Sequence, residues 1–106
     1  MSTATPDITR EIYNVAVTSA SGSQAFPQGM ANELMQIVVI PPNETADYEL
    51  YIKEGLDDME IFRRDDDIVG TYNEIVNPRL PVFGNNTFYI ENATVNGNYK
   101  LRIVYK

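Results

Sequence analysis

The 106-residue sequence contains no cysteine and no histidine. The first absence excludes disulfide bonds, thiolate metal sites and a cysteine nucleophile. The second removes the commonest general base and the commonest ligand of transition metals. The four serines therefore have no imidazole to activate them, and only carboxylate pairs are left as candidate catalytic groups.

The chain also lacks a long apolar segment. Its longest apolar run covers residues 37–40 and is followed by Pro41 and Pro42, whereas a membrane helix needs about 20 apolar residues. The N-terminal sequence MSTATPDITREIYN has no apolar region of the kind that a secretory signal contains. We therefore expect no membrane span, no secretory signal and, by length, a single domain.

Basic residues are scarce as well. The formal net charge is −7, and eleven of the 15 acidic side chains lie between residues 43 and 74. Nucleic-acid binding depends on many Lys and Arg contacts to phosphates, so we expect no nucleic-acid partner. The acidic block favours solubility, and it is also compatible with head-to-tail contact between copies, because the last strand carries Lys100, Arg102 and Lys106.

The sequence is rich in apolar and polar residues that alternate with a period of two, which is typical of half-buried strands. The loop at residues 19–29 and the Asn77-Pro78 dipeptide separate strands in this interpretation, and Asn96-Gly97 is a strong signal for a type I′ hairpin. We expect Phe26, alone in the loop, to pack onto the core. The predicted strands are residues 10–18, 33–42, 46–55, 59–64, 67–76, 80–83, 85–91 and 96–106.

Seven or eight short strands with turns every 8–12 residues predict an all-β fold, namely an antiparallel β-sandwich of the jelly-roll or immunoglobulin-like type. We assign the sandwich to residues 9–106. Residues 1–8, MSTATPDI, are small and polar with one proline and predict a flexible N-terminal arm.

The stretch RRDDDIVG, residues 63–70, is the strongest chemical signal in the sequence. A calcium loop starting at Asp65 requires oxygen ligands at its fifth and twelfth positions, which are Val69 and Val76. A looser site with the acidic pair at 57–58 fails on distance, because residues 59–64 would separate the two clusters by about 20 Å. We therefore predict no metal site and a solvated turn, in which Arg63 and Arg64 partly neutralise the aspartates.

Nothing in the sequence marks an enzyme or a cofactor site. Fifteen carboxylates supply some suitably spaced pair by chance, and neither a glycine-rich phosphate loop nor a nucleophile elbow is present. We expect no catalytic residue and no cofactor.

The aromatic residues are the candidate contact residues. The strand pattern places Tyr51 and Tyr89 on the side opposite the core, and Phe62 joins them in one of two possible registers. Together with Met1 and Ile8 of the arm they form a possible interface. Outward tyrosines are also ordinary strand formers, and they can stack on sugar rings.

The order of segments LMQIVVIPP, ADYELYIKEG, MEIFRRDD, VGTYNEIVNPRLPVFGNNTFYIENA and NGNYKLRIVYK, which covers about two thirds of the chain, resembles small virion proteins of tailed bacteriophages of the capsid decoration or cement type. The resemblance lies in the pattern of strands, in the acidic, cysteine-free composition and in the loose N-terminal arm. It implies a β-sandwich subunit, often trimeric, that braces neighbouring coat subunits, and it transfers no functional residue.

We therefore expect a non-enzymatic structural protein of the virion, a capsid decoration subunit that self-associates, as a trimer by the resemblance, and binds capsid or other virion proteins. The alternative is a carbohydrate- or receptor-binding module of a tail fibre or adhesin.

Overall fold

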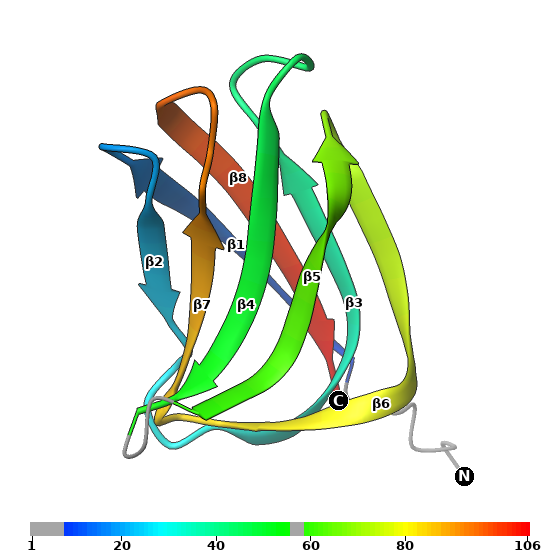
Figure 1. Cartoon of the computed structure of the whole chain (residues 1–106). Coiled ribbons are helices and arrows are strands. Elements are labelled where there is room, and N and C mark those ends of the chain that lie inside the picture. The colour runs from blue at the N-terminus through cyan, green and yellow to red at the C-terminus, as the bar shows by residue number, and fades with distance from the viewer. Residues whose placement is uncertain (1–7, 56–58) are drawn as a thin grey trace, which may run out of the picture.

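The computed structural model describes residues 8–55 and 59–106. These residues form an all-β fold of two four-stranded sheets packed face to face (Figure 1). The strands are β1 (Thr9–Val17), β2 (Gly22–Ala25), β3 (Ala31–Ile40), β4 (Asp47–Glu54), β5 (Met59–Val69), β6 (Tyr72–Phe83), β7 (Asn86–Glu91) and β8 (Gly97–Tyr105).

The strand order is that of a jelly roll. Sheet I has the order β1-β8-β3-β6 and sheet II the order β2-β7-β4-β5. The antiparallel pairs β1·β8, β2·β7, β3·β6 and β4·β5 are nested, so that the first strand pairs with the last and the innermost two form a hairpin. Wrapping such a ribbon of strand pairs produces the double-sheet jelly roll. The predicted β-sandwich is confirmed, and the jelly-roll alternative is the one that the topology supports.

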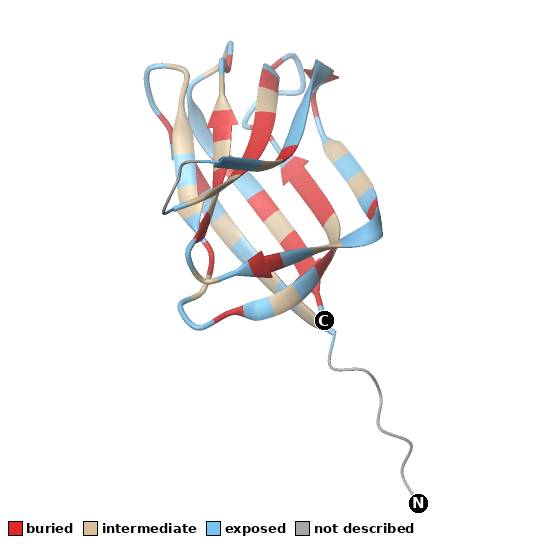
Figure 2. Ribbon diagram, turned by 60° about the horizontal axis from the view of Figure 1, so that its bottom comes forward, coloured by how far each residue is buried: buried red, intermediate tan, exposed pale blue. Residues whose placement is uncertain are grey.

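The core fills the space between the sheets. Buried and exposed residues alternate along the strands, as the banding in Figure 2 shows. The predicted inward side chains of residues 46–55, 85–91 and 96–106 are buried, and Phe26 packs onto the same core. The largest fully buried side chains are Tyr48, Tyr99, Phe88, Leu34, Ile37, Leu50, Ile52, Ile90, Leu101 and Ile103.

Two buried tyrosines use their hydroxyls to tie loops to the core. The rings of Tyr48 and Tyr99 pack edge to face with centroids 5.3 Å apart. The hydroxyl of Tyr48 donates to the carbonyl of Gly70, and that of Tyr99 donates to the carbonyl of Val95 at 2.7 Å. A buried hydroxyl needs a hydrogen-bond partner. Here the two bonds hold the turns that cross from one sheet to the other, between β5 and β6 and between β7 and β8.

Four local predictions of strands and turns were wrong. The predicted strand at residues 67–76 is divided at residues 70–71 between β5 and β6, which lie in different sheets. The loop at residues 19–29 contains β2, a four-residue strand that pairs with β7. Residues 72–83 form one strand that continues through Asn77-Pro78, whose peptide bond is cis. Asn96-Gly97 does not close a hairpin, because β7 and β8 lie in different sheets. The physical reason for the last error is that the Asn-Gly turn here serves a crossing between layers, with Gly97 at a φ of 136°.

Within the described ranges, no helix has the length and apolarity required to cross a membrane.

Candidate docking surfaces

The aspartate run lies within a strand, and the predicted solvated turn was wrong. Residues 59–69 form β5, an edge strand of sheet II. Tyr48 of β4 is opposite Ile68, and Leu50 is opposite Arg64, so residues 65–67 face a single residue of β4. Such a bulge takes the extra residues out of the regular ladder, and bulges and charges are common on edge strands because they block further pairing.

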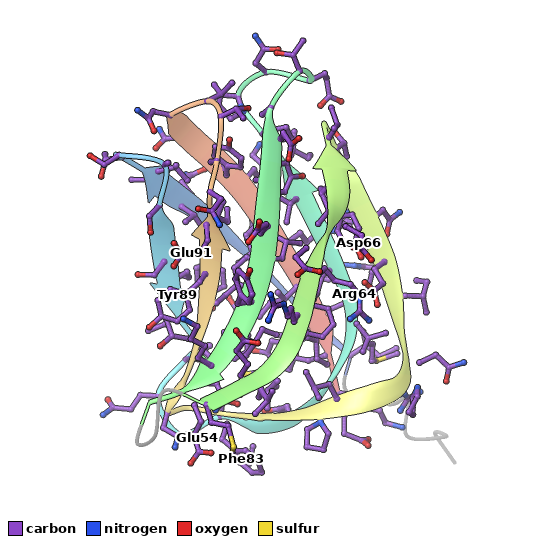
Figure 3. All side chains as sticks on the ribbon, in the orientation of Figure 1. Glu54, Arg64, Asp66, Phe83, Tyr89 and Glu91 are labelled. Carbon is purple, nitrogen blue, oxygen red and sulfur yellow. The ribbon has the colours of Figure 1, made fainter. Side chains whose placement is uncertain are left out.

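The arginines beside the run have separate partners. Arg63 Nε donates to Asp65 Oδ2 at 2.9 Å, as the sequence predicted, whereas Arg64 turns to Glu74 on β6. Figure 3 shows Arg64 and Asp66 on the side of the sandwich where β5 faces β6. A hollow of about 310 Å³ opens there, lined by Arg63, Arg64, Asp65, Asp66, Ile68 and Tyr72. Among the side chains that the structure describes, no three acidic groups gather closely enough to hold a metal ion.

Arg64 and Glu74 join the two sheets at this side. The guanidinium donates to both carboxylate oxygens, at 2.8 and 2.6 Å, and the hydroxyl of Tyr72 donates to the same carboxylate. Partial burial alone would raise the pKa of Glu74, but the bonds from Arg64 and Tyr72 outweigh it and lower that pKa below its ordinary value. Burial and the bond to Glu74 raise the pKa of Tyr72 to about 12. Because these bonds connect β5 with β6, we assign this cluster a structural role.

The predicted tyrosine pair lies on the outer face of sheet II. Tyr51 and Tyr89 are direct neighbours on β4 and β7, and Figure 3 shows Tyr89 beside Glu91 on β7. The Lys53 ammonium lies 4.9 Å from the Tyr89 ring centroid and 5.7 Å from that of Tyr51, and the Arg63 guanidinium lies 5.4 Å from the latter. These cation–π contacts leave Tyr51 only 8% exposed.

The other interface candidates are placed differently. Phe62 is opposite Ile52 and belongs to the core, 7% exposed, so its predicted outward orientation was wrong. A second irregularity of β5 explains the error. Lys53 is opposite Glu60 and Ile52 is opposite Phe62, so the extra residue Ile61 changes which of the following side chains point inward. Ile8 is half exposed and directly precedes β1. Met1 lies outside the described residues. Whether these positions take part in an interface stays a prediction.

A second surface, which the sequence analysis missed, is the outer face of sheet I. The residues opposite the core side of β1, β8, β3 and β6 include exposed Ile12, Ile40 and Ile75 together with Val38. They also include Arg10, Lys100 and Arg102. Between the bulge at Leu34–Gln36 and the end of β3, none of the outward residues is acidic. We call this surface, defined by Arg10, Ile12, Val38, Ile40, Ile75, Lys100 and Arg102, the basic face.

The cations of the basic face are free of ion pairs with any carboxylate that the structure describes. Arg102 Nε is buried without a hydrogen-bond partner among the described residues. Arg102 and Lys100 flank a shallow hollow of about 220 Å³ with Ile12, Val38 and Ile40. The register of β1 and β3 on either side of β8 creates this grouping, since Ile12 and Val38 are both opposite Arg102. The alternation within each strand was visible in the sequence, but the strand order was not.

A third hollow, of about 500 Å³, lies at one end of the sandwich, where Figure 3 shows Glu54 and Phe83 close together. Apolar residues dominate its lining, and the buried Asn86 already accepts a bond from the Phe83 amide. Among the described residues that line it, Glu54 is the one ionisable group.

Comparison of the chain with protein-family models, curated proteins and solved structures returns no match.

Proposed function

We propose that this protein is a non-enzymatic structural subunit that docks onto an extended protein lattice, as a capsid decoration protein of a virion does, and associates with further copies of itself. The basic face is the docking surface in this proposal. The outer face of sheet II, with its ion pairs and covered tyrosines, remains towards solvent and keeps the assembly soluble.

The observation that supports the proposal is the difference between the two outer faces. A protein with a net charge of −7 concentrates three cations and four aliphatic side chains on the basic face, without a described carboxylate to neutralise them. An exposed apolar patch bordered by charge is characteristic of interaction sites. The partner surface that fits it carries carboxylates around an apolar centre, and long-range attraction would speed its association.

The shape of the protein suits the same role. The basic face is a sheet surface, held on its inner side by the fully buried Leu101, Ile103 and Val39. A packed sandwich changes little on binding, so this sheet face can brace neighbouring lattice subunits without the cost of reordering.

The alternative, a glycan-binding module, depends on tyrosine rings that stack on sugars. The Lys53 and Arg63 contacts cover the rings of Tyr51 and Tyr89, and a sugar would have to displace them. This geometry favours the docking proposal over the glycan-binding one.

The test is co-sedimentation with virus particles assembled in the absence of this protein. Lys100→Glu combined with Arg102→Glu should weaken binding at least about tenfold, since each reversal replaces an attraction by a repulsion. The matched control is Lys53→Glu combined with Arg63→Glu on sheet II, which changes the net charge by the same amount.

Equal loss in both double variants would show an effect of net charge alone and would refute the basic face as the docking surface. A wild-type protein that ignores particles but binds a glycan on an array, with binding abolished by Tyr89→Ala, would replace the proposal by the glycan-binding module.

A further inference from the structure

Each sheet has two edge strands, and three of the four carry features that prevent another strand from pairing. In sheet II, β2 has only four residues, and β5 carries the bulge at residues 65–67. In sheet I, β6 contains Pro78 and Pro81, which have no amide hydrogen to donate. Short strands, bulges, charges and prolines are the usual means by which sheet edges avoid pairing.

The fourth edge strand, β1, is neither short nor bulged, and its charged residues are confined to Arg10 and Glu11 near its start. It pairs with β8 in unbroken register over nine residues and contains neither proline nor glycine. Among the residues that the structure describes, cover on its outer edge is found at its end, where Thr18 and Ser21 exchange backbone hydrogen bonds and a Cβ on Gly22 would lie 2.5 Å from the Ala16 carbonyl oxygen. The chain of β2 therefore closes the outer edge at Ala16 and leaves the preceding part open.

The open part presents a defined set of backbone groups. In an antiparallel strand the N–H and C=O of successive residues point to opposite edges. The backbone groups of Thr18 and the carbonyl of Ala16 point away from β8. Because the direction alternates along the strand, the N–H and C=O groups of Arg10, Ile12 and Asn14 also point away from β8. None of these three residues makes a backbone hydrogen bond outside its strand within the described part of the chain.

We propose that β1 pairs antiparallel with β1 of a second copy, with Ile12 opposite the partner's Ile12. This register uses all three open residues, because Arg10 then lies opposite the partner's Asn14 and each facing pair exchanges two hydrogen bonds. It joins the two sheets I into one continuous sheet and places the two basic faces side by side. The proposal deepens the self-association proposed above and rests on it.

Neighbouring registers are less favourable. A register centred on Tyr13 brings Arg10 opposite the partner's Ala16, whose edge β2 already covers. A register centred on Glu11 places two carboxylates directly opposite each other, which is destabilising. The Ile12-centred register has no pair of like charges face to face, since Glu11 lies opposite the partner's Tyr13. The contact is isologous and gives a twofold dimer in place of the trimer that the resemblance implies.

The absence of cysteine makes the proposal directly testable by cross-linking. Facing residues of a hydrogen-bonded antiparallel pair have Cα atoms about 5.5 Å apart, within the range of a disulfide. Mild oxidation of the full-length Ile12→Cys protein should therefore give a disulfide-linked dimer. The matched control is Ile75→Cys, at an equally exposed isoleucine of the same face on the far edge strand β6.

We expect the Ile12→Cys protein to cross-link at least about tenfold faster than the Ile75→Cys protein, because pairing raises the local thiol concentration. Equal rates would overturn the pairing. Ile12→Pro provides a second test, because it removes an amide hydrogen that points away from β8 and should abolish dimers in sedimentation while the melting curve stays cooperative. A wild-type protein that is monomeric or trimeric at all concentrations would also overturn it.

These outcomes are separable from those of the docking test. A monomer that still co-sediments with particles through the basic face would remove the β1 pairing and leave the docking proposal intact. A dimer that does not co-sediment with particles would remove the docking proposal and leave the β1 pairing intact.

Discussion

Arg64 and Glu74 form a two-pronged ion pair that connects β5, an edge strand of sheet II, with β6, an edge strand of sheet I. The Arg64 guanidinium also lies 4.3 Å from the Phe62 ring centroid. The pair therefore links the two sheets directly on the side of the sandwich where β5 faces β6.

Glu74→Gln should lower the free energy of unfolding by about 1 kcal/mol at pH 7, the scale of a partly exposed ion pair of good geometry. The folded-state pKa of Glu74 is lowered, so the pair's contribution is complete above the unfolded-state value of about 4.3 and is lost as the pH falls through the lower folded value. Urea unfolding at pH 7 and pH 3 should therefore show a difference between wild type and variant that shrinks in acid. A difference that is the same at both pH values would contradict this assignment.

Ile103→Ala should lower the free energy of unfolding by about 2–5 kcal/mol, because it leaves a cavity at a fully buried position of β8 between the two sheets. Ile75→Ala is the control, since Ile75 is 68% exposed on the basic face, and its effect should stay within about 0.5 kcal/mol. Denaturant unfolding of both variants measures the two values. A large effect at Ile75 would mean that this side chain is covered in the isolated protein.

Gly70→Ala should be more harmful than Gly29→Ala, although both glycines have a positive φ, 74° and 80°. The left-handed conformation costs an alanine about 1–2 kcal/mol at either position. At Gly70 the new Cβ would also lie 2.9 Å from the Glu44 carbonyl oxygen, whereas nothing lies within 4 Å at Gly29. Thermal unfolding of the two variants compares them, and equal melting temperatures would show that the loop at Glu44 yields without cost.

Tyr51 should ionise late in an alkaline titration. The hydrogen bond to Glu49, followed by burial, raises the pKa of Tyr51 to about 12. Glu49→Ala removes the largest cause and should bring this pKa down towards the ordinary tyrosine value of about 10. Ultraviolet titration of the phenolate, with Tyr51→Phe to identify the signal, measures the change. An unchanged curve in Glu49→Ala would show that the hydrogen bond does not form in solution.

The sequence predicted the fold class because the period-two pattern of strands such as β4, β7 and β8 is regular. Tyr48, Leu50 and Ile52 alternate with polar residues, and each is buried as expected. The pattern failed where strands are irregular. The extra residue at Ile61 shifts the register of β5, so Phe62 was placed on the wrong side, and Pro78 was taken as the end of a strand that continues past it.

The candidate sites were less predictable, because a surface made of several strands depends on the strand order. Ile12, Val38 and Arg102 come from three segments that the sequence separates widely, and only the placement of β8 between β1 and β3 brings them together. Tyr51 and Tyr89 were correctly placed on one outer face. The contacts of Lys53 with the Tyr89 ring and of Arg63 with the Tyr51 ring could not be predicted, since each joins two neighbouring strands.

The nested pairing has a consequence for how the chain is made. Strand β8 is an inner strand of sheet I, and both β1 and β3 hydrogen-bond to it. During synthesis the earlier strands emerge from the ribosome while their shared neighbour does not yet exist, and only the β4–β5 hairpin has its nearest partner at hand. Sheet I is therefore complete only after residues 97–105 have been translated, although β3 can pair with β6 before then. Pairings between distant segments are slow to form, so the nascent polypeptide passes through a stage in which β1 has no partner and β3 lacks one of its two, and both are open to aggregation.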